Sequence, residues 1–264
     1  MYPILFRIHT YTVYSYTVSL VMGMAAGTYL AYRLAQKRLP LPQVVLDAVF
    51  WGVLGGLLGG RVGYVIANGA YFAEHWAKAF ALWKGGLTWH GALIGGSISI
   101  AYWYILRRKN TYSTPDWRIL LDTMAPGLAL GGAFGWLGCL LTGCAYGAQA
   151  SGYAPPLSWI AADLPDLYGV DEIRFATQPL MIACCLLICL LLLWLQDKWP
   201  AGLGFALYLL LCALADFGIA FLRGDGTWRF GLWLSQWMAI AEMLVAVALG
   251  AYVLSSARAR DRTR

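Results

Sequence analysis

The feature that most limits how this chain can fold is a series of apolar runs, several of them longer than the roughly 18 residues that mark a bilayer-spanning helix. Hydrophobic residues make up 60% of its 264 residues and charged residues 12%, against about 45–50% apolar and about 25% charged in ordinary globular domains. So few charges cannot cover a water-facing surface around this much apolar mass. The sequence therefore predicts an all-α polytopic membrane protein.

Hydropathy predicts seven transmembrane helices in one domain over residues 1–255, followed by a basic cytoplasmic tail over 256–264. The longest connection, about 143–177, is expected to form a cap over the outer end of the helices. We find no internal repeat of the kind that builds many transporters from two halves. The predicted spans run near residues 13–32, 44–67, 87–106, 119–142, 178–196, 202–221 and 233–254.

Lysine and arginine residues are distributed unequally between the two sides of these spans. Twelve of the 19 lie in alternate connections and the tail, and six lie in the opposite connections. Because cytoplasmic loops carry the excess of positive charge, the amino terminus is predicted outside and the carboxyl terminus in the cytoplasm. This bias accounts for the net charge of +6 without a nucleic-acid partner. The twelve cytoplasmic residues are Arg33, Lys37, Arg38, Arg107, Arg108, Lys109, Arg118, Lys198, Arg258, Arg260, Arg262 and Arg264.

The second predicted span combines glycine ridges with a cation. Glycines recur every four residues at 52, 56 and 60 and again at 55, 59 and 63, which predicts close packing against another helix. Arg61 lies in the outer half of the span, with Tyr64 three residues on. An isolated arginine at this depth is costly, so we expect an anion such as a lipid phosphate, or a structural ion pair. The acids considered for that pair are Asp47, Asp122, Asp216 and Glu242.

A second polar group lies at the outer start of the third span. Gly85 and Gly86 expose backbone amides where a helix begins, which suits an anionic headgroup. His90 follows and is either a base, since imidazole accepts a proton near neutral pH, or a hydrogen-bonded packing residue. Tyr16, near the outer start of the first span, is either part of the same site or an interfacial belt tyrosine.

Small residues and cysteines mark the outer end of the fourth span. Gly135, Gly138, Gly143 and Gly147 predict close packing and a site wall. The cysteines lie in apolar stretches without a CxxC pattern or a neighbouring histidine, so they predict neither a disulfide framework nor a metal site, but buried, unreactive thiols. The six cysteines are Cys139, Cys144, Cys184, Cys185, Cys189 and Cys212.

Arg223 lies at the outer exit of the sixth span and is followed by the turn sequence Gly224-Asp225-Gly226. Alone it reads as an anchor that extends to the headgroups. Together with Arg61, Tyr64, His90 and Tyr16 it places two guanidiniums, two phenols and an imidazole at one depth. This combination suggests a site for an anionic phospholipid headgroup.

These residues also carry a family likeness, since the chain resembles the prolipoprotein diacylglyceryl transferases, bacterial plasma-membrane enzymes that modify the lipobox cysteine of lipoprotein precursors. The likeness covers most of the chain. Its most specific segments are Gly59-Gly60-Arg61-Val-Gly63-Tyr64, Gly85-Gly86-Leu87-Thr-Trp-His90-Gly91, Gly135-x-x-Gly138, Thr177-Gln178 and Phe221-Leu222-Arg223.

The resemblance implies that a diacylglyceryl group passes from phosphatidylglycerol to a cysteine thiol, without a cofactor, on the outer side of the bacterial inner membrane. His90 and Tyr16 would help to activate the thiol. The expected partners are phosphatidylglycerol, the lipobox segment of a prolipoprotein and membrane lipids, and the chain is expected to be a monomer. The residues implied to bind the phospholipid headgroup are Arg61, Tyr64, Arg223, Gly85, Gly86 and Gln178.

The chain departs from the family pattern at several positions, which keeps two alternatives open: a catalytically silent relative that binds phospholipid or lipoprotein, and a transferase with another acceptor. The pattern has an arginine, two amides and a carboxylate at four positions of the fourth span, Tyr-Glu in the fifth and an arginine in the sixth. The residues found there are Trp136, Cys139, Thr142, Cys144, Leu180, Met181 and Asp216.

Overall fold

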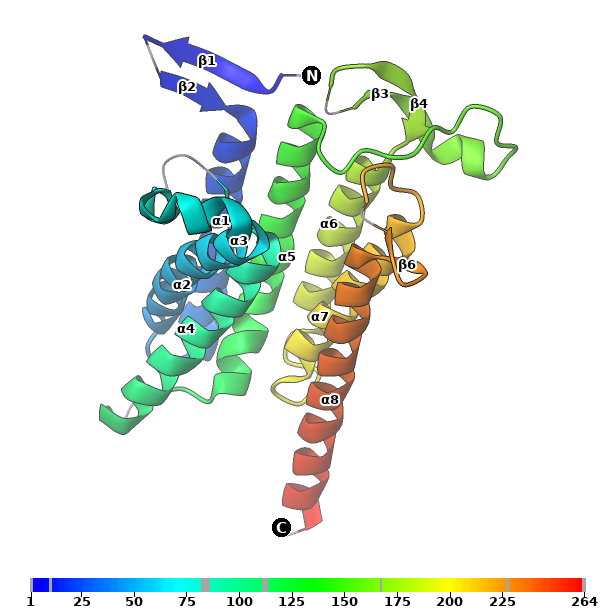
Figure 1. Cartoon of the computed structure of the whole chain (residues 1–264). Helices are drawn as coiled ribbons and strands as arrows, with labels where there is room; N and C mark the ends of the chain where they lie inside the picture. The colour runs from blue at the N-terminus through cyan, green and yellow to red at the C-terminus, as the bar shows by residue number, and fades with distance from the viewer. Residues whose placement is uncertain are drawn as a thin grey trace. The chain divides into compact units, whose positions relative to one another are not determined.

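The computed structural model describes residues 2–9, 11–81, 86–110, 114–166, 168–226 and 228–262. Within these ranges seven helices have 18 residues or more, and each overlaps one predicted span (Figure 1). Five of them, α2, α5, α6, α7 and α8, are long and apolar enough to cross a membrane. The seven are α1 (Ser15–Arg38), α2 (Val44–Ala67), α4 (Trp89–Asn110), α5 (Trp117–Thr142), α6 (Thr177–Leu195), α7 (Leu203–Ala220) and α8 (Leu234–Arg262).

Short elements join these helices, and the strands among them correct the all-α prediction. Three antiparallel hairpins lie between or before the long helices. Hydropathy passed over them because strands of two to five residues are too short to give a clear periodic signal. The short elements are β1 (Ile4–Ile8), β2 (Tyr11–Tyr14), α3 (Gly69–Glu74), η1 (Trp76–Phe80), η3 (Leu157–Ile160), β3 (Ala161–Pro165), β4 (Asp171–Phe175), β5 (Trp228–Arg229) and β6 (Leu232–Trp233).

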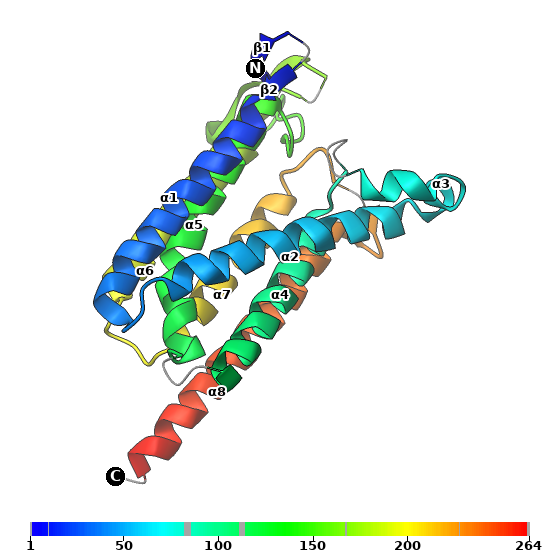
Figure 2. The ribbon, with the colours of Figure 1, turned by 90° about the vertical axis from the view of Figure 1, so that its left-hand side faces the viewer.

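The chain divides into two compact units, one made of residues 1–34 and 118–264 and the other of residues 35–117. In the second unit α2 and α4 pack along each other (Figure 2). A Cβ built on Gly59 would overlap the carbonyl of Gly91 and lie 2.7 Å from the Cα of Gly95. The predicted close packing of the α2 glycines is therefore confirmed, and the partner surface is a second glycine ridge on α4.

In the first unit, facing glycines likewise allow close packing between α1 and α5, which lie side by side in Figure 2. A Cβ on either Gly27 or Gly127 would overlap the carbonyl of the other. Beyond this contact α5, α6 and α7 share a core of small and branched residues, and α8 packs against α7. Close backbone approach of this kind favours helix association in lipid, where apolar burial gives no preference for protein over acyl chains.

A carboxylate from α5 caps the start of α7. The two oxygens of Asp122 accept hydrogen bonds from the backbone amides of Gly202 and Phe205, at 2.6 and 2.7 Å. These amides have no partner within the helix, so an acid at this point satisfies them and offsets the positive end of the helix dipole. Asp122 therefore has a structural task in the first unit.

Candidate functional site

Arg61 lies in α2 with 8% of its surface exposed, and three of its nitrogens donate to backbone carbonyls. Nε donates to Ala79 at 2.7 Å, Nη2 to Lys78 at 2.6 Å and Nη1 to Gly86 at 3.1 Å. All three carbonyls belong to the connection between α2 and α4. The guanidinium thus holds this connection against α2 through three backbone carbonyls, and its predicted contact with an anion stays a prediction.

Aromatic rings complete the surroundings of Arg61. Its guanidinium carbon lies 5.6 Å from the ring centres of both Tyr64 and Phe72, and these two rings meet edge to face. Cations over ring faces are favoured electrostatically. Gly86 lies against the Tyr64 ring with a φ of +79°, so a side chain there would be both strained and blocked. Arg61, Tyr64 and Gly86 are therefore brought together, as predicted.

Thr88 connects this cluster to the start of α4. Its backbone amide donates to the carbonyl of Gly60 at 3.0 Å, and its own carbonyl accepts from Ala92 at 3.0 Å. His90 is the second residue of α4, so its backbone position follows from this anchored start. The side chain of His90 and the whole of Gly85 lie outside the described residues, so their predicted roles stay predictions.

Tyr16 meets the glycine-rich end of α5 in the first unit. It is the second residue of α1 and is 38% exposed. A Cβ on Gly138 would lie 2.9 Å from Cδ2 of the Tyr16 ring. The neighbouring Ser19 donates to the carbonyl of Phe134 at 2.6 Å. Tyr16 is thus a partly accessible phenol whose ring rests on α5, and Gly138 does form a wall beside it.

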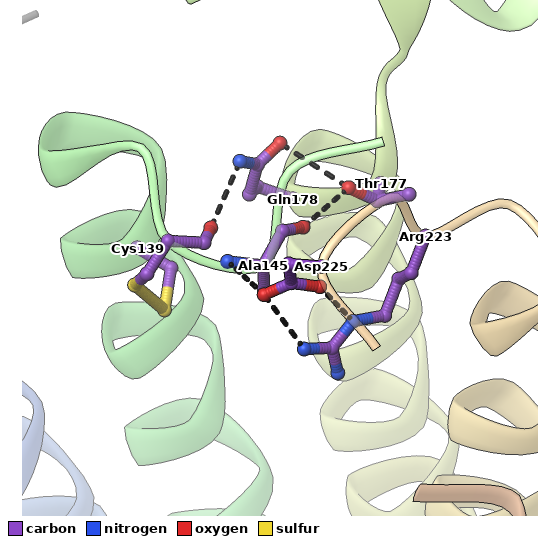
Figure 3. A network of polar contacts seen from close by, with 7 residues as sticks. Cys139, Ala145, Thr177, Gln178, Arg223 and Asp225 are labelled. Carbon is purple, nitrogen blue, oxygen red and sulfur yellow. Dashed lines mark hydrogen bonds and ion pairs between the residues drawn. A yellow bond between two sulfur atoms is a disulfide. The ribbon is translucent and has the colours of Figure 1, made fainter. Parts of the chain in front are cut away.

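Arg223 is paired with the carboxylate two residues further on (Figure 3). Its Nε and Nη2 donate to the two oxygens of Asp225 at 2.9 and 3.1 Å. Asp225 also accepts the backbone amide of Ala145 at 3.1 Å, so it joins the end of α7 to the loop after α5. The prediction singled out Arg223 and treated Asp225 as part of a turn. The signal that the prediction missed was the presence of an acid two residues after the arginine.

Gln178 and Thr177, at the start of α6, hold the same loop from the other side (Figure 3). The Gln178 amide donates to the carbonyl of Cys144 at 3.0 Å, and the Thr177 hydroxyl donates to the carbonyl of Ala145 at 2.7 Å. Gln178 is only 2% exposed. Its side-chain amide therefore holds the loop at Cys144, and the headgroup binding that the resemblance implied stays a prediction.

Cys139 and Cys144 form a disulfide between the last turns of α5 and the loop that Gln178 holds, with their Cα atoms 4.7 Å apart (Figure 3). This corrects the expectation that the cysteines are all unpaired thiols. The pattern offered no CxxC, yet the helix ends between the two residues, and Gly143 at a φ of +75° turns the chain back. The other four cysteines are free, and Cys185 and Cys189 are buried.

The remaining wall glycines have different surroundings. A Cβ on Gly147 would overlap the carbonyl of Phe175. Gly147 also pairs with Arg223 as an isolated β-bridge. A Cβ on Gly135 would meet no atom within 4 Å. Of the two, Gly147 is required by close approach, and Gly135 is free of that constraint.

The long connection 143–177 contains a second buried arginine that sequence reasoning missed. Arg174 is 7% exposed and pairs with Asp166 at 3.1 Å and with Glu172 at 2.9 Å. The amides of Val170 and Tyr168 donate to Asp166 and, with the nearby Arg174 charge, hold the pKa of this carboxyl below its ordinary value. These contacts brace the β3–β4 hairpin internally, and its predicted role as a cap stays a prediction.

The structure brings predicted site residues together in two local groups, one in each unit. Arg61, Tyr64 and Gly86 cluster in the second unit, and Tyr16 lies beside Gly138 in the first. Across the described ranges, no group of three or more His, Cys, Asp or Glu residues is arranged to hold a metal ion.

Comparison with known proteins gives consistent matches. The family model described as prolipoprotein diacylglyceryl transferase matches residues 3–252. A phosphatidylglycerol–prolipoprotein diacylglyceryl transferase of Gloeobacter violaceus is 39% identical over 150 residues, which cover 56% of this chain and 54% of that protein. Proteins of the same description from Burkholderia thailandensis and Burkholderia mallei are 29% and 28% identical over 260 residues, which cover 84% of this chain and 86% of each. With its apolar helices and a match over nearly its whole length, this multi-pass membrane protein belongs to the prolipoprotein diacylglyceryl transferase family.

Proposed function

We propose that this chain transfers a diacylglyceryl group from phosphatidylglycerol to the lipobox cysteine thiol of a prolipoprotein. The observation that carries the proposal is the set of hydrogen bonds around the motif residues 59–64 and 86–91. The chain that contains these motifs matches the family over residues 3–252. Arg61, Gly86 and Thr88 fix the loop that leads into α4, and that loop delivers His90.

The proposed step forms a carbon–sulfur bond and breaks a carbon–oxygen bond. The thiol gives its proton to a base, for which we assign His90, and the thiolate attacks the glyceryl carbon that carries the phosphate ester. Glycerol phosphate leaves with the electron pair of the broken bond. A thiol with an ordinary pKa near 8.5 needs such a base at neutral pH, and Tyr16 is proposed to assist with its phenol.

Arg61 and Arg223 are proposed as positioning residues. Three nitrogens of Arg61 donate hydrogen bonds to backbone carbonyls, and two nitrogens of Arg223 donate to the carboxylate of Asp225. Each guanidinium thus shapes a loop in its own unit. Headgroup contact is assigned to the phenol of Tyr64 and to backbone amides at Gly85 and Gly86.

The proposed setting is the bacterial inner membrane. All seven long helices cross this membrane, and the amino terminus lies outside. The site faces outward, and the chain is a monomer. Support comes from the excess of lysine and arginine on one side of the spans. The basic residues at the end of α8 belong to the cytoplasmic side.

A second candidate is a relative that binds phospholipid or lipoprotein without turnover. It is favoured by the Cys139–Cys144 disulfide, which occupies positions where the family pattern has an amide and a carboxylate. Loss of one transition-state donor costs about 10²–10³ in rate in well-studied enzymes. A transferase with a different acceptor is the remaining alternative.

The test uses the full chain in nanodiscs, phosphatidylglycerol labelled in its acyl chains, and a lipobox peptide, with product followed by mass spectrometry. Transfer that is lost in His90→Ala and kept in His9→Asn supports the proposal. His9 is an exposed histidine at a φ of +55°, where asparagine is tolerated, so it is a matched control.

Two results would overturn it. Folded protein that retains phosphatidylglycerol without transfer indicates the silent relative. Transfer to other thiols with the lipobox peptide ignored indicates a different acceptor.

A further inference from the structure

The hairpin before α8 presents an aromatic side chain in an unusual conformation. Strands β5 and β6 pair Trp228 with Trp233 and Arg229 with Leu232. The two turn residues, Phe230 and Gly231, both have positive φ, +48° and +83°, as in the type I′ turns of two-residue hairpins. Phe230 is 93% exposed.

Neither the residue preferences of the turn nor packing within the chain explains why a phenylalanine occupies position 230. Turns of this type prefer asparagine, aspartate or glycine, because a bulky residue at positive φ is strained. A phenylalanine buried in a core would offset that strain, yet this ring is nearly fully exposed. Trp228 beside it is 58% exposed, and Arg229 between them is exposed as well.

The hairpin is fastened to the first turn of α8. The indole of Trp237 donates to the carbonyl of Arg229 at 3.0 Å, and the fully buried Gln236 accepts the backbone amide of Trp233 at 3.0 Å. The rings of Trp228 and Trp233 meet edge to face with centres 5.0 Å apart. The depth of the hairpin in the membrane is therefore set by α8.

The length of α8 places the hairpin at the depth of the lipid headgroups. Leu234–Ala259 is apolar enough to span a membrane. From Leu234 to Arg258 the helix rises about 36 Å, at 1.5 Å per residue, against a hydrocarbon core of about 30 Å. With Arg258 at one interface, Leu234 and the hairpin before it lie at the other.

We propose that the β5–β6 hairpin is a lipid anchor that inserts into the interface of the leaflet where α8 begins. Phe230 enters the upper acyl region, Trp228 lies at headgroup depth, and Arg229 pairs with a lipid phosphate. The surface continues onto α8, where Leu234 and Trp237 are 44% and 42% exposed. Aromatic residues with a polar edge and arginines that bind phosphate are favoured at this depth. The proposal is independent of catalysis.

A photo-cross-linking amino acid at position 230 tests it. The full chain carrying benzoylphenylalanine there is reconstituted in nanodiscs of mixed phosphatidylglycerol and phosphatidylcholine, irradiated and examined by mass spectrometry. The matched control carries the same group at Tyr168, which is 84% exposed in the β3–β4 turn. In Figure 1 that hairpin lies beyond the start of α6, whereas β6 lies beside the start of α8.

We expect at least tenfold more lipid adduct from position 230 than from position 168. Arg229→Gln should lower the share of phosphatidylglycerol among the adducts toward its share in the bilayer. Equal adduct yields at 230 and 168, or no lipid adduct at 230, would overturn the proposal. Adducts that shift from lipid to an added lipobox peptide would assign the hairpin to peptide docking and would also overturn it.

Discussion

Gly86 lies directly against the ring of Tyr64: a Cβ at position 86 would be 2.5 Å from Cε1 and 2.8 Å from Cδ1 of that ring. The same glycine has a φ of +79°, and its carbonyl accepts a hydrogen bond from Arg61. One residue therefore combines a left-handed backbone conformation that favours glycine, a ring contact and an arginine contact. The loop that leads to His90 depends on all three.

Gly86→Ala is expected to displace this loop. The substitution adds a methyl group where the ring has no room and forces alanine to a positive φ, which together cost about 1–3 kcal/mol. We expect diacylglyceryl transfer to fall by up to about a hundredfold, as for other displaced catalytic groups. Steady-state transfer rates in nanodiscs measure this. Gly69→Ala is the control, because a Cβ there meets nothing within 4 Å, and equal rates for both variants would contradict the argument.

Arg61→Lys is expected to behave almost like Arg61→Ala. Lysine keeps the charge, but a single ammonium cannot reach three carbonyls that the fork of a guanidinium serves at once. Each hydrogen bond lost contributes about 0.5–1.5 kcal/mol to the free energy of unfolding, so the midpoint of thermal unfolding in detergent should fall clearly. Arg33→Lys is the matched control, since Arg33 contacts Tyr29 at an exposed site. A Lys variant as stable as the parent would show that charge alone suffices.

Asp225→Ala is expected to release both Arg223 and the loop after α5. It removes the acceptor of the Ala145 amide and the partner of the guanidinium, so hydrogen exchange at residues 143–148 should quicken. If Arg223 instead served the headgroup, freeing it from Asp225 should tighten phosphatidylglycerol binding and leave exchange unchanged. Asp171→Asn, at an exposed acid of β4, should change neither measurement.

Denatured, unreduced protein is expected to titrate four thiols, because six cysteines are present and two are paired. Replacing Cys139 and Cys144 together by serine should lower stability by about 2 kcal/mol on the chain-entropy scale for so short a loop. Melting curves with and without reductant measure the difference. A Cys184→Ser variant should keep the response to reductant, and six titrated thiols would contradict the pairing.

Acid is expected to loosen the β3–β4 hairpin through Asp166. Its pKa is lowered in the folded state, chiefly by the amide of Val170, so its stabilising contribution is complete above the ordinary value of 3.8 and is lost as the pH falls through the lower folded value. Asp166→Asn should therefore raise amide exchange in the hairpin at neutral pH and have a smaller effect in acid below pH 3.8. Asp163→Asn, at an exposed position of β3, should leave exchange unaltered at both pH values.

The lengths of the apolar runs determined the positions of the seven long helices, because bilayer thickness sets how many apolar residues a span needs. Glycine spacing on α2 likewise predicted close packing, since four-residue spacing lines one helix face. The hairpins, the disulfide and the partners of Arg61 came from the tertiary structure alone, whereas the partner of Arg223 lies two residues on in the sequence. Arg61 binds carbonyls 17 to 25 residues away, and Asp225 binds an amide 80 residues away. Backbone donors and acceptors are the same at every residue, so no periodic pattern records which of them folding brings within reach of a side chain.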